Sequence, residues 1–473
     1  MREPGEIVFV SCYEPGHQPQ GVASGIAHLR RAGFLPTCID LAVEPLDANA
    51  RARLQAARLV AISAPMHTAL VLGRRVAAQV REVNAGAHLC FFGLYAALNR
   101  VVLAGEADSL FGPDCAPQLV ALAEALAAGA PPATAPVTPG RQESLVPERD
   151  ALPALGKYAR LAIGEVRRVA GHVEATRGCK HLCRHCPIPP VYEGRFFAVP
   201  AEIVLADARA QIAAGARHID FGDPDFLNGP SHALRIARAL HQEHPDVTFS
   251  FTAKVEHIVR HQELIPQLAA AGAVFVVSAV ESLSDRVLGA LAKGHRAADV
   301  ARALAIVRDA GISLRPTFVA FTPWTTVDDY LDLCRFIRAN ELEQEVDPVQ
   351  LSLRLLVPPG SLLLTAPDIA PFLGPLDELA ASYRWTHPDP RMDRLEAEIS
   401  ALVEAATGAG EAPVLTFTRI HRLAAVAAGA HDEAAAAVDP TAPLGRQRRP
   451  APPHLTEPWF CCATPTRRQL GAL

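Results

Sequence analysis

Two series of alternating strand-type and helix-type segments constrain the fold of this 473-residue chain more than any other feature. Short apolar runs rich in Val, Ile and Phe alternate with amphipathic stretches over residues 6–125, and again from about residue 172 to residue 359. Strands that alternate with helices form parallel βαβ units, which bind ligands at the carboxyl ends of the strands. The sequence therefore predicts two α/β units with functional loops at those ends.

The first series predicts a doubly wound, Rossmann-like domain over residues 1–126. The predicted strands are residues 7–11, 37–41, 59–63 and 88–92, and the predicted helices are 21–32, 70–83 and 116–128. Residues 127–145, rich in Pro and Ala, lack the side chains needed for a core and predict an interdomain linker.

The second series predicts a partial (β/α)6, TIM-like barrel over residues 146–365, because six repeats fall short of the eight that close a barrel. The predicted strands are residues 172–175, 218–221, 248–252, 274–280, 314–321 and 350–357. Residues 366–428 are predicted to be mainly helical, with a strand at 414–417. Residues 429–473 are low in complexity and predict a flexible tail.

Composition excludes several classes of function. Half of the residues are hydrophobic, and the net charge of −5 comes with no long basic stripe, so nucleic-acid binding is not expected. No window approaches the roughly 20 apolar residues that span a bilayer. The N-terminus lacks the pattern of a secretory signal. We expect a cytoplasmic protein without a membrane partner.

The ten cysteines of a cytoplasmic chain do not predict disulfides. Three of them, Cys179, Cys183 and Cys186, fall within eight residues just after a predicted strand, where a loop can wrap round a metal centre. Thiolates hold iron–sulfur clusters, and three thiolates on a four-iron cluster leave one iron open for chemistry. The alternatives are a zinc site completed by His181 or His185, and three unrelated buried thiols.

The spacing C-x3-C-x2-C after the first strand of a barrel resembles the defining loop of the radical S-adenosylmethionine superfamily. The resemblance implies a [4Fe–4S] cluster on these three cysteines, with its open iron chelating the amine and carboxylate of S-adenosylmethionine. In that family, electron transfer to the sulfonium gives methionine and a 5′-deoxyadenosyl radical. It also implies a small-molecule substrate and an electron donor such as flavodoxin or ferredoxin.

Later positions agree with the resemblance and supply candidate ligands for S-adenosylmethionine. Asp223 and Asp225 end the second strand, where the family binds the methionine amine. Solvated turn residues before a proline are the alternative for both.

Ser278 and Glu281 end the fourth strand, where they could bind the ribose or the amino-acid moiety. The alternative for Glu281 is an ion pair with Lys293 or Arg315, because a carboxylate at the end of a buried strand needs a partner.

A doubly wound domain ahead of such a barrel resembles the cobalamin-binding class of the superfamily, which implies cobalamin as a further cofactor. The cobalt-ligating motif D-x-H-x-x-G is absent, and the nearest histidine, His17, has a different spacing. Many barrel-linked relatives lack that histidine as well. The alternative is a degenerate domain that supports the barrel or binds substrate.

Near its C-terminus the chain carries a Cys461-Cys462-Ala-Thr segment, followed by a short basic remainder, that resembles the tail of a radical S-adenosylmethionine family named for Cys-Cys-Ala-Glu-Pro, with Thr464 in place of Glu. Adjacent thiols on a tether could act in catalysis, bind a soft ion or relay electrons. The alternative is a packing anchor built on Trp459 and Phe460.

The sequence therefore predicts an enzyme that cleaves S-adenosylmethionine and modifies a small metabolite or a natural-product intermediate, with methyl transfer favoured if cobalamin binds. A second enzymatic hypothesis is aminocarboxypropyl transfer to a thiophilic acceptor such as arsenite. The non-enzymatic alternative is an iron–sulfur electron carrier or a redox or metal sensor.

Overall fold

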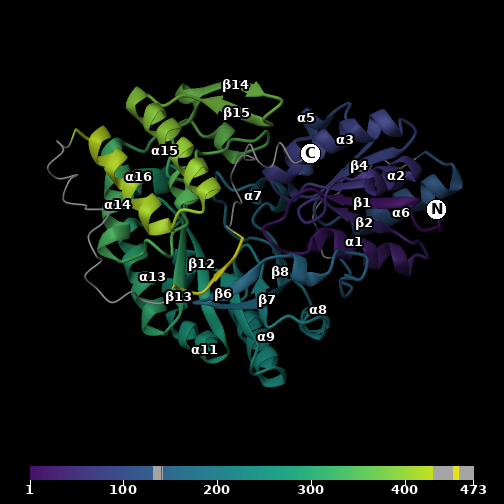
Figure 1. Ribbon diagram of the computed structural model, residues 1–473, viewed down its shortest axis with the longest axis horizontal. Coiled ribbons are helices and arrows are strands. Elements are labelled where there is room, and N and C mark those ends of the chain that lie inside the picture. The colour runs from purple at the N-terminus through teal and green to yellow at the C-terminus, as the bar shows by residue number, and fades with distance from the viewer. Residues whose placement is uncertain (132–139, 141, 430–450, 458–473) are drawn as a thin grey trace.

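The computed structural model describes residues 1–131, 140, 142–429 and 451–457. Two α/β halves lie side by side, and the C-terminal helices cover one of them (Figure 1). None of the described helices is both long and apolar enough to cross a membrane. The three predictions of an α/β fold, a partial barrel and a helical C-terminal region are confirmed.

The N-terminal half is a five-stranded parallel sheet in the order β2-β1-β3-β4-β5. This is a doubly wound order, because β2 is added on one side of β1 and the later strands are added on the other side. Its strands are β1 Ile7–Ser11, β2 Thr37–Asp40, β3 Leu59–Ser63, β4 His88–Phe92 and β5 Ser109–Phe111. Its helices are α1 Gln20–Arg31, α2 Ala48–Ala56, α3 His67–Val83, α4 Leu94–Leu98, α5 Arg100–Leu103 and α6 Ala116–Ala128.

Alternation along β1 explains why both faces of this sheet carry helices. Val8 and Val10 join the core formed with α2 and α3, whereas Ile7 and Phe9 join the core formed with α1 and α6. A parallel sheet with two apolar faces is stable only when helices cover both.

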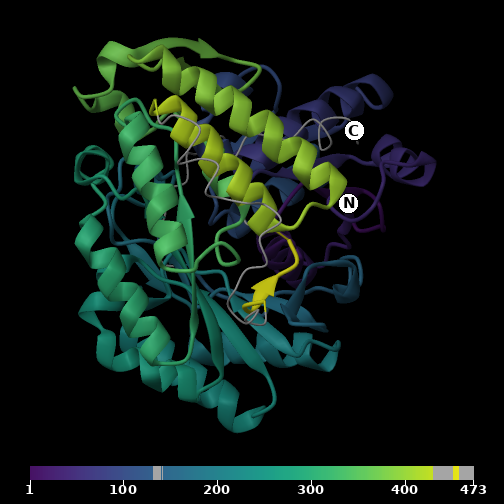
Figure 2. The ribbon, with the colours of Figure 1, turned by 60° about the vertical axis from the view of Figure 1, so that its left-hand side comes forward.

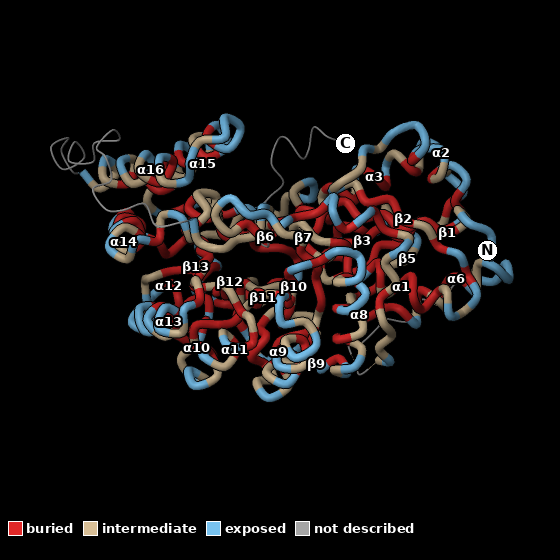
Figure 3. Tube along the Cα trace, turned by 60° about the horizontal axis from the view of Figure 1, so that its bottom comes forward, coloured by how far each residue is buried: buried red, intermediate tan, exposed pale blue. Residues whose placement is uncertain are grey.

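The second half is a seven-stranded sheet in the order β13-β12-β11-β10-β7-β6-β16. Its parallel strands are β7 Val166–Val173, β10 His218–Phe221, β11 Thr248–Thr252, β12 Ala273–Glu281 and β13 Ser313–Phe318. Two antiparallel strands, β6 Arg160–Ile163 and β16 His454–Leu455, extend the edge beside β7. Strands β10 to β13 are mostly buried, whereas β6, β16 and the start of β7 are partly exposed, and the helices around the sheet are exposed mainly on their outer sides (Figure 3).

The helices and short elements of this half follow the expected alternation. The main helices are α8 Ala201–Ala213, α9 Pro230–Glu243, α10 Val255–Arg260, α11 Ile265–Ala270, α12 Asp285–Ala290, α13 Ala297–Asp309 and α14 Val327–Ala339. The short elements are β8 Thr176–Gly178, α7 Pro189–Tyr192, β9 Phe196–Ala198 and the 3-10 turns η1 Leu155–Lys157, η2 Phe226–Asn228, η3 Gln262–Leu264 and η4 Pro348–Leu351.

The predicted sixth strand at residues 350–357 is wrong in its extent. The segment begins inside η4, and only an isolated bridge between Phe321 and Arg354 continues the sheet. The side chain of Arg354 instead reaches Asp393 at 2.9 Å and stacks on Trp385 at 3.6 Å. These contacts hold the segment against the C-terminal region.

The C-terminal region contains a hairpin and two helices that pack side by side (Figure 2). Its elements are η5 Leu362–Thr365, η6 Ala370–Phe372, β14 Leu373–Asp377, β15 Ser382–Trp385, α15 Pro390–Ala409 and α16 Pro413–Ala427. The predicted strand at 414–417 is wrong because Pro413 occupies the first turn of α16. Phe417, Ile420 and Ala424 then form one helical face on the barrel core.

A close backbone approach fixes the turn after β4. Gly93 has a φ of 115°, and a Cβ there would lie 2.8 Å from the carbonyl carbon and oxygen of Ala64. Only glycine fits both constraints.

We expect Gly93→Ala to destabilise the protein by about 2 kcal/mol or more, because it combines a left-handed backbone with a clash against main chain. Gly112→Ala is the matched control, since a Cβ at Gly112 meets open space. Thermal unfolding of the two variants checks this. Equal melting temperatures would contradict the assignment of strain to Gly93.

Candidate functional site

A cavity of about 510 Å³ lies where the two halves meet. Its walls come from segments that follow parallel strands in both halves, including Glu14 after β1, Met66 after β3, Asp223 after β10 and Lys254 after β11. The carboxyl ends of both sheets therefore open onto one shared space, as expected for parallel βαβ units.

The cysteine loop forms one wall of this cavity. It follows β8, whose last residue, Gly178, has a φ of 75°, and a Cβ on Gly178 would lie 2.5 Å from the Arg195 carbonyl oxygen. Cys179, Cys183 and Cys186 all line the cavity, and the first two are buried. Burial raises the pKa of the free Cys179 thiol.

The spacing of the thiols favours a cluster over a single ion. In the described part of the chain, one group of three potential ligands has all its ligand atoms within 4.8 Å, and it contains none of these cysteines. The three sulfur atoms are thus not all within 4.8 Å of one another, as the ligands of one zinc ion would be. Neither histidine of the zinc alternative turns to the thiols, since His185 contacts Glu281 and His181 contacts His257.

The two aspartates after β10 take different positions. Asp223 lines the cavity, and its carboxylate accepts hydrogen bonds from the Ala175 amide at 3.0 Å and the Thr176 hydroxyl at 2.5 Å. Burial raises the pKa of Asp223 to about 7. Asp225 lies outside the cavity lining, caps η2 through the Leu227 amide and is fully buried. The solvated-turn alternative does not describe either side chain.

Lys293 and His185 stabilise the charged form of the Glu281 carboxylate at the cavity wall. Its Oε1 lies 3.2 Å from Lys293 Nζ and 3.1 Å from His185 Nε2. Burial alone would raise the pKa of Glu281, but the Lys293 ammonium and His185 outweigh it and hold the pKa at about 2. The backbone of Glu281 has a φ of 68°, a strained conformation found often at ligand sites.

Of the two ion-pair partners that the sequence offered for Glu281, Lys293 and Arg315, the structure pairs it with Lys293. Both residues also line the cavity, so the ion pair and a ligand-binding role are compatible. Ser278 lies on the opposite face of β12, outside the cavity lining, with its hydroxyl fully buried and unpaired. A role for Ser278 in ligand binding stays a prediction without support from this position.

A chain of polar side chains that the sequence did not predict begins at the cavity wall, where His172 is buried and His17 and Asp220 are half-buried. The rings of His17 and His172 stack with centroids 3.5 Å apart, and His172 Nδ1 lies 3.2 Å from Asp220 Oδ2. Ser250 donates to Asp220 at 2.6 Å and lies 3.0 Å from His218 Nε2. Inward-pointing polar residues at alternate positions of β7, β10 and β11 were the available signal.

Cys461 and Cys462, predicted as catalytic, lie outside the described residues. The described chain before them ends at the cavity: His454–Leu455 pairs with β6, and Glu457 lines the cavity and accepts a hydrogen bond from the Tyr13 hydroxyl at 3.1 Å. The prediction for the two thiols stays open.

Comparison with protein families identifies the barrel half. Residues 173–337 match the model of the Radical SAM superfamily. A ribosomal protein uS12 methylthiotransferase RimO from Solibacter usitatus is 26% identical over 254 residues, covering 50% of this chain and 50% of its own. A tRNA-2-methylthio-N(6)-dimethylallyladenosine synthase from Chlorobium luteolum is 28% identical, covering 38% and 43%. The chain spans about half the length of these curated relatives.

Solved structures extend the likeness to both halves. The radical S-adenosylmethionine methyltransferase TsrM from Kitasatospora setae, with cobalamin and a [4Fe–4S] cluster bound, has a TM-score of 0.55 at 17% identity, covering 72% of this chain and 71% of its own. OxsB, a cobalamin-dependent S-adenosylmethionine radical enzyme, reaches 0.68 at 15% identity, covering 85% and 67%. These matches establish the shared fold.

We expect Lys293→Met to destabilise the protein by about 3–5 kcal/mol, because it leaves the Glu281 carboxylate buried without its ammonium partner. Adding Glu281→Gln should recover much of that loss. Lys157→Met is the control: its pair with Glu44 is exposed at the surface and should contribute less than about 1 kcal/mol. Chemical denaturation measures all three. A loss from Lys293→Met no larger than from the control would contradict the assignment.

Proposed function

Because this chain carries a radical SAM domain over residues 173–337 and is an enzyme, we propose that it methylates a small molecule in the interdomain cavity. One molecule of S-adenosylmethionine would be cleaved to methionine and the 5′-deoxyadenosyl radical that activates the substrate, and a second molecule would donate the methyl group. One observation carries the proposal. Three cysteine thiols, the Glu281–Lys293 pair and residues of the N-terminal sheet line a single cavity. Cluster, S-adenosylmethionine and a further cofactor would thus meet in one space.

The barrel half supplies the groups that would hold the cluster and S-adenosylmethionine. Cys179, Cys183 and Cys186 are the cluster ligands, and a cluster bound there supplies the electron that breaks the sulfonium bond. Asp223 is suited to accept the ammonium group of the methionine moiety, because its carboxylate faces the cavity. The Glu281–Lys293 pair offers an acceptor and a donor beside the cysteine loop.

The N-terminal half fits cobalamin, which when bound supplies a methyl carrier. A second cavity of about 200 Å³ lies at the carboxyl edge of its sheet, lined by Ser24, Ser63 and Gly93. Both cavities share Glu14 and Glu174 in their linings, so one ligand with a broad ring and a tail could occupy both. Burial raises the pKa of both carboxyl groups.

The donor and acceptor set of this junction suits the amide-bearing rim of cobalamin. Glu14 Oε1 is buried and has no hydrogen-bond partner, so it offers an acceptor to a ligand amide. His17 also lines the interdomain cavity, where its ring stacks on His172 of the barrel. The D-x-H-x-x-G motif that supplies a cobalt-ligating histidine in other cobalamin domains is absent from this chain.

The His172–Asp220 pair is a candidate for proton transfer with the substrate. The carboxylate orients the imidazole, and Ser250 donates a hydrogen bond to the other carboxylate oxygen. A histidine fixed by a carboxylate at a cavity wall is a common general base. The substrate itself is a small molecule that this cavity accommodates.

We expect the cluster-loaded protein to retain hydroxocobalamin stoichiometrically through anaerobic gel filtration, measured by its visible absorbance. Ser24→Phe, which fills the smaller cavity, should weaken this binding by about tenfold or more. Ser231→Phe, exposed on α9, is the matched control and should bind normally. No retention by the wild-type protein with intact cluster would exclude cobalamin.

The affinity for S-adenosylmethionine should depend on pH through Asp223. Its raised pKa of about 7 means that the free carboxyl group is increasingly protonated below pH 7, while the bound ammonium favours the carboxylate. Affinity should therefore fall as pH drops below 7, by up to about tenfold per pH unit.

Calorimetric titration between pH 5.5 and 8.5 measures this slope. Asp223→Asn should weaken binding and flatten the dependence, whereas Asp246→Asn, exposed before β11, should keep it. An unchanged slope in Asp223→Asn would remove this residue from the site.

A further inference from the structure

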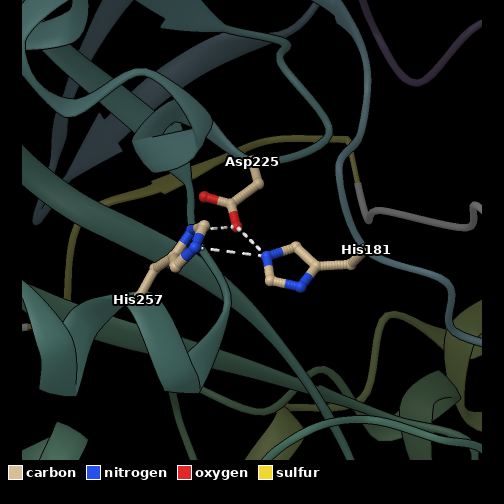
Figure 4. A group of neighbouring side chains, drawn as sticks. All are labelled: His181, Asp225 and His257. Carbon is tan, nitrogen blue, oxygen red and sulfur yellow. Dashed lines mark hydrogen bonds and ion pairs between the residues drawn. The ribbon is translucent and has the colours of Figure 1, made fainter. Parts of the chain in front are cut away.

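His181, Asp225 and His257 converge from three separate parts of the barrel half (Figure 4). His181 belongs to the cysteine loop, Asp225 follows β10, and His257 lies on α10. His181 Nε2 is 3.2 Å from His257 Nε2 and 3.8 Å from Asp225 Oδ2, and Asp225 Oδ2 is 2.6 Å from His257 Nδ1. His257 thus presents Nε2 to His181 and Nδ1 to Asp225, and one ligand atom from each of the three residues lies within 4.8 Å of the other two.

The Asp225 carboxylate is buried, and one of its oxygens accepts no hydrogen bond. Asp225 and His257 are both 0% exposed. Asp225 Oδ1 accepts from the Leu227 amide, but Asp225 Oδ2 and His257 Nδ1 have no hydrogen-bond partner despite their short separation. The nearby Lys254 ammonium pairs with Glu256 at 3.5 Å. A buried carboxylate oxygen without a donor is costly, and a bound cation would remove that cost.

We propose that His181, Asp225 and His257 bind one divalent cation of the zinc type. Two imidazoles and a carboxylate are a common zinc ligand set, and with ligand bonds of about 2.0–2.1 Å the ligand atoms lie about 3–4 Å apart. One ligand atom from each residue already lies within 4.8 Å of the others, so a turn of the His257 ring that points one nitrogen at both partners would bring the set to that spacing. The three cysteine thiols are not part of this group.

The surroundings complete the site. Glu256 Oε2 lies 3.7 Å from His181 Nδ1, on the side of the ring away from the proposed ion, as in carboxylate–histidine–zinc arrangements. His181 also lines the interdomain cavity, so a water molecule or a substrate heteroatom in that cavity could supply a fourth ligand. The ion would tie the cysteine loop to β10 and α10. It would also put a Lewis acid at the edge of the reaction chamber.

The test measures zinc in the full-length, cluster-loaded protein after incubation with Zn²⁺ and removal of loose metal by a weak chelator. Mass spectrometry should find one zinc per chain in the wild-type protein, and Zn K-edge X-ray absorption should find nitrogen and oxygen ligands without sulfur. His257→Ala and the isosteric Asp225→Asn should each lose the zinc while keeping the iron content of the wild type.

His261→Ala is the matched control, since its ring lies 5.6 Å from that of His257 without joining the group. It should keep the zinc. Three results would overturn the proposal: no zinc in the wild-type protein, zinc–sulfur scattering at about 2.3 Å, or zinc retained by both ligand variants. Because iron content is measured separately, loss of the zinc site and loss of the cluster are distinguishable.

Discussion

The arrangement of this molecule depends on the direction of its strands. All five strands of the N-terminal sheet are parallel, and so are five neighbouring strands of the barrel sheet, so each sheet collects the loops that follow these strands at one edge. The two edges face each other across the cavity. Residues 14 and 281, far apart in the chain, therefore line the same chamber. Candidate functional groups concentrate there because parallel sheets place their ligand-binding loops at the carboxyl ends of the strands.

The surroundings of two carboxyl groups in the chamber give them very different pKa values. Asp223 and Glu281 are both buried carboxyl groups, yet the pKa of the first is raised to about 7 by burial, while Lys293 and His185 outweigh burial and hold the pKa of the second at about 2. The ionised Glu281 is a fixed charge, and Asp223 is poised to respond to an arriving ammonium group. Environments that push the pKa values of like groups apart are a mark of functional sites.

The sequence was sufficient for features that depend on local pattern. The run Ile7–Ser11 is buried on both faces and is recognisable as a strand without any knowledge of its neighbours. The cysteine loop was recognisable from spacing alone. Features formed by residues far apart in the sequence could not be recognised in this way. The His17–His172 stack and the Asp225–His257 pair join residues that no periodicity relates. The segment at 350–357 has a strand-like composition, and its Arg354 contacts with the C-terminal region override that preference.

The most direct test of the proposed chemistry is cleavage of S-adenosylmethionine by the reconstituted, reduced protein under anaerobic conditions, followed by mass spectrometry. We predict 5′-deoxyadenosine from the wild-type protein, none from Cys183→Ala, and continued formation by the Cys461→Ala/Cys462→Ala double variant, which keeps all three cluster ligands. Methylthioadenosine in its place would indicate aminocarboxypropyl transfer. Neither product from a protein with its full complement of iron would contradict radical cleavage and favour an electron carrier or sensor.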